Sequence, residues 1–219
     1  MEELFYERIA AVLDQAHRID QKCELFGASK HQYRLNPPID ETVVRAVEER
    51  YNFRLPEDYV CFITKIANGG AGPDYGIMPF EESLMTGAYN CFQEAYKRSL
   101  KKPFTPRRMM LEEVEKFSFF KAAYEQEPDK YFIYEKEDDD ICGTDGFFLL
   151  GTRGCQWDFG LIVSGGRTGQ VFDTDNEGAY AFTAHSFNEF YREWLDWLSD
   201  TENVQRELEK WRKLRLGRK

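Results

Sequence analysis

A helix with a marked beginning and a marked end, between residues 55 and 70, constrains the fold of this chain most. Pro56 suits the first turn of a helix, and Glu57 and Asp58 follow where the helix dipole favours negative charge. Asn68-Gly69-Gly70 ends the helix, because glycine adopts the left-handed conformation of a helix end. Between these signals, apolar residues recur at helical spacing: Tyr59, Phe62, Ile63 and Ile66. The sequence therefore predicts a short helix with one buried face.

Two amphipathic helices are expected before it. Asp40 can cap a helix at residues 41 to 51, and Ile39 can pack against Val44 as a hydrophobic staple. Its buried stripe is expected to be Val43, Val44, Val47 and Tyr51. Residues 2 to 20 form an N-terminal helix whose apolar positions are Leu4, Phe5, Ile9, Val12, Ala16 and Ile19.

Two more helices are expected near the C-terminus. Ser186 and Glu189 form a capping box, in which each side chain satisfies an exposed backbone N–H of the other residue. The helix that follows has a wide, mainly aromatic face: Phe187, Phe190, Tyr191, Trp194, Leu195 and Leu198. Thr201 can cap a last, basic helix with the apolar stripe Val204, Leu208, Trp211 and Leu214.

Apolar runs of strand length fill the middle of the chain. They are residues 131–134, 147–150, 159–163 and 170–173, with an earlier run at 75–78. Glycine-bearing turns separate the last three long runs, which indicates consecutive antiparallel strands. Residues 81 to 130 have helical stretches broken by Pro103 and Pro106, and we interpret them as a helical insertion.

The charge of the chain limits its partners. The net charge is −10 and the sequence pI is about 5.0, so the molecule as a whole repels nucleic-acid phosphates and anionic lipids. Residues 202 to 219 differ, because they hold seven Lys and Arg against three Glu. We therefore expect an acidic body with a basic terminal helix, and neither nucleic acid nor membrane as a partner.

The cysteines and the apolar runs indicate a cytoplasmic protein. The five cysteines are an odd number with no CxxC pair, so neither a disulfide framework nor a zinc site is expected. The N-terminus lacks a basic signal-peptide region, and Phe147 to Leu150 is far shorter than a membrane span. We expect the thiols to be reduced.

Three stretches of the sequence together resemble the SUKH superfamily, which includes immunity proteins of bacterial toxin systems and yeast glucan-synthesis regulators. The most specific is Leu55-Pro56-Glu57-Asp58-Tyr59 leading into Asn68-Gly69-Gly70. The second is Tyr75-Gly76-Ile77-Met78-Pro79. The third runs from Leu149-Leu150-Gly151 through Gly154 and Gly169-Gln170-Val171 to Ser186-Phe187 and Phe190.

The resemblance implies an α+β fold in which helices pack around a mixed, largely antiparallel sheet. It divides the chain into an N-terminal helical extension at 1–35, a SUKH-like domain at 36–199 with the insertion at 81–130, and a basic C-terminal helix at 200–219. It implies protein binding without catalysis, so no catalytic residue, cofactor or metal is expected. Ten matched residues are expected to serve the fold: Leu55, Pro56, Tyr59, Asn68, Gly69, Gly70, Gly76, Gly151, Ser186 and Phe187.

Two places are candidates for the partner-binding surface. The first is an acidic run made of Glu135, Glu137, Asp138, Asp139 and Asp140. It is either a solvated loop or a landing patch for a basic partner, whose association its field would accelerate. The second is the loop that ends at Asp74 and Tyr75, which could border a surface groove.

Other patterns that suggest chemistry are interpreted as structural. Residues 173 to 178 mimic the start of a calcium loop, but the twelfth position is Ala184 instead of a bidentate glutamate. His185 and Ser186 are adjacent at a helix start and point in different directions, which disfavours a hydrolase pair. The glycine-rich turns at 151–154 and 165–167 lack the lysine and serine of a phosphate loop. Basic residues between Lys97 and Arg108 form either a solvated face or a docking surface for an acidic protein.

The sequence therefore favours a protein-binding module, either a monomer or a weak homodimer. Our main hypothesis is an immunity protein that neutralises a basic toxin domain through an acidic surface. A scaffold or regulator of the cell-wall-synthesis type, which recruits partners through its terminal helices, is the alternative. An enzyme that uses the carboxylates of a cleft is a third, weaker hypothesis.

Overall fold

Six strands form one antiparallel sheet in the computed structural model, which describes residues 2–86, 93–114, 116, 121–134, 145–155, 157–175 and 178–216. The strands are β1 (Arg107–Arg108), β2 (Tyr131–Ile133), β3 (Phe147–Gly154), β4 (Trp157–Ile162), β5 (Val171–Thr174) and β6 (Ala179–Ala184). Their order is β1-β2-β6-β5-β4-β3, and each pairing is antiparallel. The α+β fold is confirmed, with a sheet that is antiparallel throughout the described strands.

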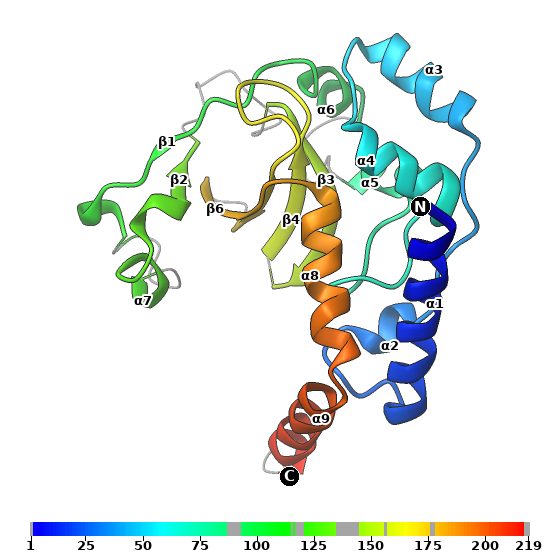
Figure 1. The fold of residues 1–219 in the computed structure, drawn as a ribbon. Coiled ribbons are helices and arrows are strands. Elements are labelled where there is room, and N and C mark those ends of the chain that lie inside the picture. The colour runs from blue at the N-terminus through cyan, green and yellow to red at the C-terminus, as the bar shows by residue number, and fades with distance from the viewer. Residues whose placement is uncertain are drawn as a thin grey trace.

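Helices cover one side of this sheet and extend below it (Figure 1). They are α1 (Glu2–Ile19), α2 (Ala28–His31), α3 (Glu41–Tyr51), α4 (Glu57–Cys61), α5 (Phe80–Thr86), α6 (Gln93–Ser99), α7 (Lys121–Tyr124), α8 (Phe187–Ser199) and α9 (Thr201–Leu216). Short 3₁₀ turns lie at Leu111–Glu113 and Pro128–Lys130. α8 packs on the sheet and on α4, and α1 and α9 both contact α8. None of the helices in the described ranges combines the length and apolar character needed to cross a bilayer.

The sheet is buried on both faces, as the alternation along β3 shows. Phe148 and Leu150 belong to the main core, which also holds the apolar faces of α1, α4 and α8. Phe147 and Leu149 point to the opposite face and pack in a second cluster with Phe104, Phe172 and Tyr180. Because both faces are apolar, β3 reads in the sequence as a continuous hydrophobic run.

The helix predicted after Pro56 forms, but it changes type halfway. α4 begins at Glu57 and continues into a π-helical turn, Phe62–Ile66, where the Ala67 N–H donates to the Phe62 carbonyl at 2.8 Å. Such a turn holds one residue more than an α-helical turn, which helical periodicity alone does not reveal. The chain then turns at Gly69 and Gly70, whose φ angles of 75° and 104° are the left-handed values expected of a glycine stop.

Helices α3 and α8 begin at their predicted caps, with differences in detail. The Asp40 side chain accepts from the Thr42 N–H at 2.8 Å, but Val43 is 44% exposed, so its predicted burial was wrong. Ser186 Oγ accepts from the Glu189 N–H at 3.1 Å. The Glu189 carboxylate reaches back one residue further than predicted and accepts from the His185 N–H at 2.6 Å.

The start of α9 corrects another prediction. Asp200, not Thr201, caps this helix, because its carboxylate accepts from the Glu202 N–H at 2.9 Å and the Asn203 N–H at 3.2 Å. Thr201 is already the first helical residue, so its hydroxyl cannot take the cap position.

Three predictions about the sheet were incomplete. Residues 81–130 are not purely helical, since β1 lies within them and pairs with β2. The run at 75–78 forms no full strand; it borders β3 through a bond from the Met78 N–H to the Leu150 carbonyl at 2.8 Å. β6 was missed because three of its six residues are alanine and a polar segment precedes it, which is a weak strand signal.

Candidate functional site

The acidic run of Glu135, Glu137, Asp138, Asp139 and Asp140 lies outside the described residues. Its role as a landing patch therefore stays a prediction. The calcium-like segment is described in part: Asp173 pairs with Arg153, and Asp175 Oδ1 accepts from the Ala179 N–H at 3.0 Å, while Asn176 and Glu177 lie outside the description. Within the described ranges, no group of three or more His, Cys, Asp or Glu side chains is placed to hold a metal ion.

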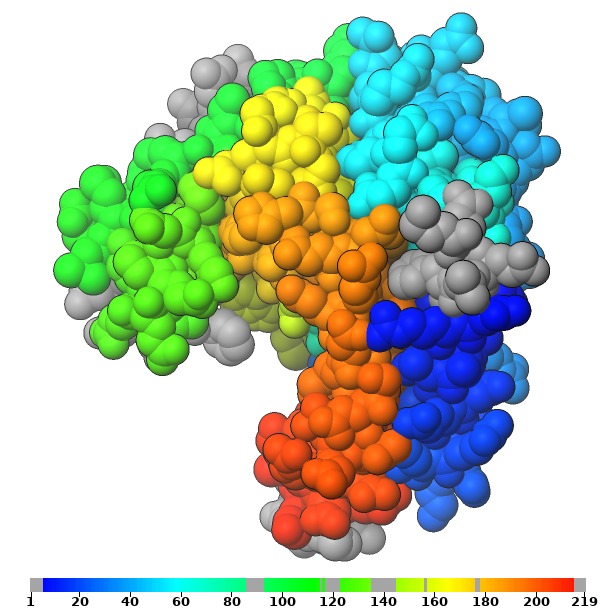
Figure 2. Space-filling model, in the orientation of Figure 1, coloured from blue at the N-terminus to red at the C-terminus, as the bar shows by residue number. Residues whose placement is uncertain are grey.

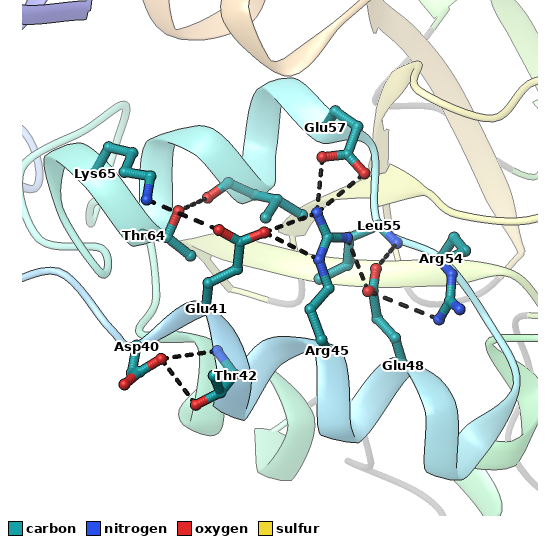
Figure 3. Close-up of polar contacts among 11 residues, drawn as sticks. Asp40, Glu41, Thr42, Arg45, Glu48, Arg54, Leu55, Glu57, Thr64 and Lys65 are labelled. Atoms are coloured by element: carbon teal, nitrogen blue, oxygen red, sulfur yellow. Dashed lines mark hydrogen bonds and ion pairs between the residues drawn. The ribbon is translucent and has the colours of Figure 1, made fainter.

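The motif that begins at Leu55 is held by an ion-pair cluster between α3 and the start of α4 (Figure 3). This Arg45 cluster consists of Arg45, Glu41, Glu48 and Glu57. Glu48 is 0% exposed; it accepts from Arg45 Nη1 at 2.9 Å and from the Leu55 N–H at 2.6 Å. Arg45 Nη2 also lies 2.8 Å from Glu57 and 3.1 Å from Glu41. These carboxylates raise the pKa of Arg45, with Glu57 and Glu48 contributing most.

The next turn of the motif is tied to α8. Asp58 Oδ2 accepts from the Asn188 N–H at 3.0 Å, in the first turn of that helix. Tyr59 is fully buried, with its ring centroid 5.6 Å from that of Phe148 and 5.0 Å from that of Phe187. The most specific sequence motif thus fastens α3, α4 and α8 together, and these contacts are internal to the fold.

A pocket of about 470 Å³ lies where the two ends of the chain meet the sheet. We call it the Arg153 pocket; its lining is Leu25, Phe26, Ala28, His31, Tyr33, Gly72, Pro73, Asp74, Arg153, Trp194, Trp197, Leu198, Glu207 and Trp211. These residues come from the α2 region, the loop before α5, the end of β3, and helices α8 and α9. Figure 2 shows the orange-to-red surface of α8 and α9 beside the blue surface of α1.

The segment from Asp20 to Tyr33 is fixed by a buried carboxylate. Asp20 is 0% exposed and accepts from the Glu24 N–H at 2.7 Å, the Leu25 N–H at 2.9 Å and the Tyr33 hydroxyl at 2.8 Å. Gly27 then passes against the loop before α5: it has φ +77°, and a Cβ there would lie 1.6 Å from the Asp74 carbonyl oxygen. Only glycine permits this approach, so Gly27 sets one wall of the pocket.

Stacked aromatic rings form a second wall. Phe26 stacks on Tyr75 at 5.2 Å and on Trp211 at 5.5 Å between ring centroids. This three-ring stack connects the α2 region, the loop before α5 and α9. Phe26 and Trp197 are 40% and 39% exposed, so the pocket presents aromatic faces to solvent. Concave sites that are lined by aromatic side chains and a few polar groups are typical of binding sites.

The floor of the pocket carries a second arginine with two acidic partners. In this Arg153 cluster, Arg153 Nη1 lies 3.1 Å from Asp74 Oδ2, and Arg153 Nη2 lies 3.0 Å from Asp173. Burial raises the pKa of Asp74, and Arg153 opposes this by lowering it. Burial also raises the pKa of Asp173, with Asp74 adding to the rise and Arg153 opposing it. The poorly solvated carboxylates of Asp74 and Asp173 therefore share the single guanidinium of Arg153.

His31 is a neutral member of the lining. Its Nδ1 accepts from the Tyr33 N–H at 3.0 Å, which places the ring proton on Nε2. Burial lowers the pKa of His31 to about 4, so the imidazole is uncharged at neutral pH. The histidine thus adds no positive charge to the pocket.

The two groove residues proposed from the sequence fall at this pocket. Asp74 lines it, and Tyr75 stands at its edge in the ring stack. The other lining residues were missed as site residues, although Trp194 and Trp211 had been assigned to apolar helix stripes. Arg153 had been taken as part of a simple turn. An exposed tryptophan such as Trp197, one position outside the apolar stripe of α8, was the available signal.

Comparison with known proteins places most of the chain in one family. The model of the SMI1 / KNR4 family (SUKH-1) matches residues 38–193, which is more than half of the chain. No curated protein matches the chain, and no solved structure matches it. The Arg45 cluster lies wholly inside the matched region. Ten of the fourteen residues that line the Arg153 pocket lie outside it, in the segments before residue 38 and after residue 193.

Proposed function

The chain belongs to the SMI1/KNR4 family (SUKH-1), and from this membership we propose that it is a non-catalytic immunity protein that binds and neutralises a basic toxin domain. The family is generally non-catalytic. The ionisable groups in the pocket agree with binding rather than turnover: Asp74 and Asp173 are paired with Arg153, and His31 is buried and neutral.

The observation that carries this proposal is the excess of negative charge. The chain has 39 Asp and Glu against 29 Lys and Arg, although residues 202–219 carry a positive surplus. A toxin that degrades nucleic acid needs a basic surface to hold phosphates, and an acidic inhibitor is attracted by the same field. Such complementarity accelerates encounter and selects the partner by charge.

The test is protection and binding with toxin domains encoded beside the gene. Each domain is produced with and without this protein, and cell survival is measured together with Kd at increasing salt. We expect survival to be restored by one domain, with binding that weakens as salt rises because the encounter is electrostatic. If no neighbouring domain is bound at low salt and none is made harmless, the immunity proposal is wrong.

A charge variant tests the surface itself. Neutralising Glu135, Glu137, Asp138, Asp139 and Asp140 to their amides is expected to slow association by about tenfold, because steering depends on the local field. The matched control neutralises five exposed acids elsewhere: Asp14, Glu49, Glu82, Glu202 and Glu209. Equal slowing by both sets would mean that overall charge, and not the acidic run, guides the partner.

The alternative, a scaffold that recruits proteins through its terminal helices, is separated by α9. Val204 and Leu208 of α9 are buried, so deleting the helix would damage the core. Lys213→Glu and Leu214→Asp instead change only exposed positions. Loss of partner capture with these variants, with toxin protection absent, would support the scaffold.

A further inference from the structure

Three polar atoms of the Arg153 pocket are buried without a hydrogen-bond partner. They are Asp74 Oδ2, Arg153 Nε and Trp211 Nε1, out of five such side-chain atoms in the described part of the chain. Asp74 Oδ2 lies in an ion pair with Arg153, but the geometry between the Arg153 N–H groups and this oxygen does not form a hydrogen bond. Buried polar groups in folded proteins are nearly always satisfied, so three on one pocket indicate a missing binding partner. That partner must offer a donor to Asp74 and acceptors to the two N–H groups.

The charge of the lining points to a cation. Asp74 and Glu207 are acidic, Arg153 is basic, and His31 is neutral at physiological pH. Arg153 is already shared between Asp74 and Asp173, while Glu207 pairs at the rim with Lys210 at 3.0 Å. The floor therefore retains an uncompensated negative charge in a place of low solvation.

The aromatic walls specify the kind of cation. Phe26, Trp197 and Trp211 line the pocket together with Asp74, and Phe26 and Trp197 are 40% and 39% exposed, whereas the Tyr75 ring already has Lys30 Nζ over it at 5.9 Å. A planar guanidinium stacks on such faces and donates to a carboxylate at the same time, whereas an ammonium is a compact, strongly hydrated charge. The volume of about 470 Å³ holds a side chain together with its own peptide groups, whose carbonyls supply the acceptors that the Arg153 Nε–H and the Trp211 indole N–H need, since a guanidinium only donates.

We propose that the Arg153 pocket receives an arginine side chain of the partner protein, with the guanidinium donating to Asp74 between aromatic faces. This assignment rests on the proposed function, since a basic partner supplies the arginine. Ten of the fourteen lining residues lie outside the family-matched region, whereas the charged residues Asp74 and Arg153 lie inside it.

The test uses N-acetyl-arginine amide as the probe and the tryptophan indole N–H resonances as the readout. The full chain has four tryptophans, three of which line the pocket. We expect saturable shifts of the Trp211 resonance, at least tenfold weaker binding of N-acetyl-citrulline amide, and weaker binding of N-acetyl-lysine amide. The citrulline compound keeps the shape and removes the charge. The proposal is overturned if the arginine and citrulline compounds bind equally well, or if the arginine compound causes no shift.

Variants establish that Asp74 is the acceptor. Asp74→Asn is expected to weaken arginine binding at least tenfold, and asparagine tolerates the left-handed backbone at this position, where φ is 51°. Asp14→Asn, on the exposed side of α1, is the matched control and should bind normally. If Asp74→Asn alters resonances far from the pocket, Trp211→Phe replaces it, because it removes the indole donor and keeps a ring; binding is then read from the Trp194 and Trp197 indole resonances. Undiminished binding by both pocket variants overturns the proposal.

The two proposals fail separately. If the protein binds and neutralises a toxin domain equally well with Asp74→Asn, and the arginine probe is inert, the pocket proposal is wrong and the immunity proposal stands. If the probe binds as expected but no toxin domain is recognised, the pocket stands and its natural occupant belongs to another basic protein.

Discussion

Two arginines in this molecule each face several carboxylates, and they differ in what remains unpaired. In the Arg45 cluster, the buried Glu48 uses its oxygens on Arg45 and on the Leu55 N–H. In the Arg153 cluster, Asp74 Oδ2 and Arg153 Nε have no hydrogen-bond partner. The first cluster lies inside the family-matched region, and the second opens into a pocket built largely outside it. A closed network stabilises the fold, whereas an incomplete one is available to a ligand.

Breaking the closed cluster should have the largest effect. Glu48→Ala is expected to destabilise the protein by about 3 kcal/mol, because Arg45 and the Leu55 N–H both lose a buried partner. The measurement is urea unfolding. Glu49→Ala, at the adjacent exposed position, should change stability by less than about 0.5 kcal/mol. A small effect at Glu48 would mean that the cluster does not hold the motif in place.

Disturbing the wall of the Arg153 pocket at Gly27 should have the next largest effect. Gly27→Ala is expected to cost about 2 kcal/mol, since the new Cβ meets the Asp74 carbonyl and φ is +77°. Urea unfolding measures the cost, and tryptophan fluorescence reports displacement of Phe26 from Trp211. Gly166→Ala is the control, because a Cβ there meets nothing within 4 Å. Similar results for both glycines would show that the Gly27 contact is not tight.

In the Arg153 cluster, Asp74→Asn removes one negative charge. It should change the free energy of unfolding by less than about 1 kcal/mol, and in the opposite direction from Glu48→Ala. The pKa of Asp74 is raised in the folded state, mainly by burial. A raised carboxyl pKa favours folding below the unfolded value of 3.8, and that advantage is lost as pH rises through the folded pKa. Asp74→Asn should therefore gain relative to the wild type over this window.

The check is the unfolding free energy of both proteins between pH 3 and pH 7. We expect the difference to move in favour of Asp74→Asn as the pH rises. If Asp74→Asn instead loses stability relative to the wild type as the pH rises, Arg153 stabilises the Asp74 carboxylate more than burial destabilises it.

The smallest effect is expected at the exposed edge of the closed cluster. Glu41→Gln should cost no more than about 0.5 kcal/mol, because this ion pair with Arg45 is solvated and Glu48 and Glu57 remain. High salt should remove even this difference, which urea unfolding at two salt concentrations measures. A cost near that of Glu48→Ala would mean that the cluster acts as one unit.

Helices and strands were predicted well from the sequence where the residues that determine them are neighbours in the chain. The capping residues Asp40 and Ser186 and the glycine stop at Gly69 were readable because the interacting groups are neighbours in sequence. The π-helical turn and the exposure of Val43 were not, since tertiary packing decides which turn of a helix faces the core.

The site was less predictable because its parts come from distant segments. Asp74 and Tyr75 were proposed from their loop, but Phe26, Arg153 and Trp211 meet there only through the fold. Glu41, Arg45 and Glu48 had helical pair spacing, so their contact was foreseeable. The complete burial of Glu48 was not, because it depends on the Leu55 backbone folding back over α3.

The ring stack of Tyr75, Phe26 and Trp211 also has a consequence in time. Its members span most of the polypeptide, so the pocket cannot be completed during synthesis until residue 211 has left the ribosome and α9 has folded back. A chain that ends before α9 lacks Trp211 and also the buried Val204 and Leu208, so it would lose one wall of the pocket together with part of the main core.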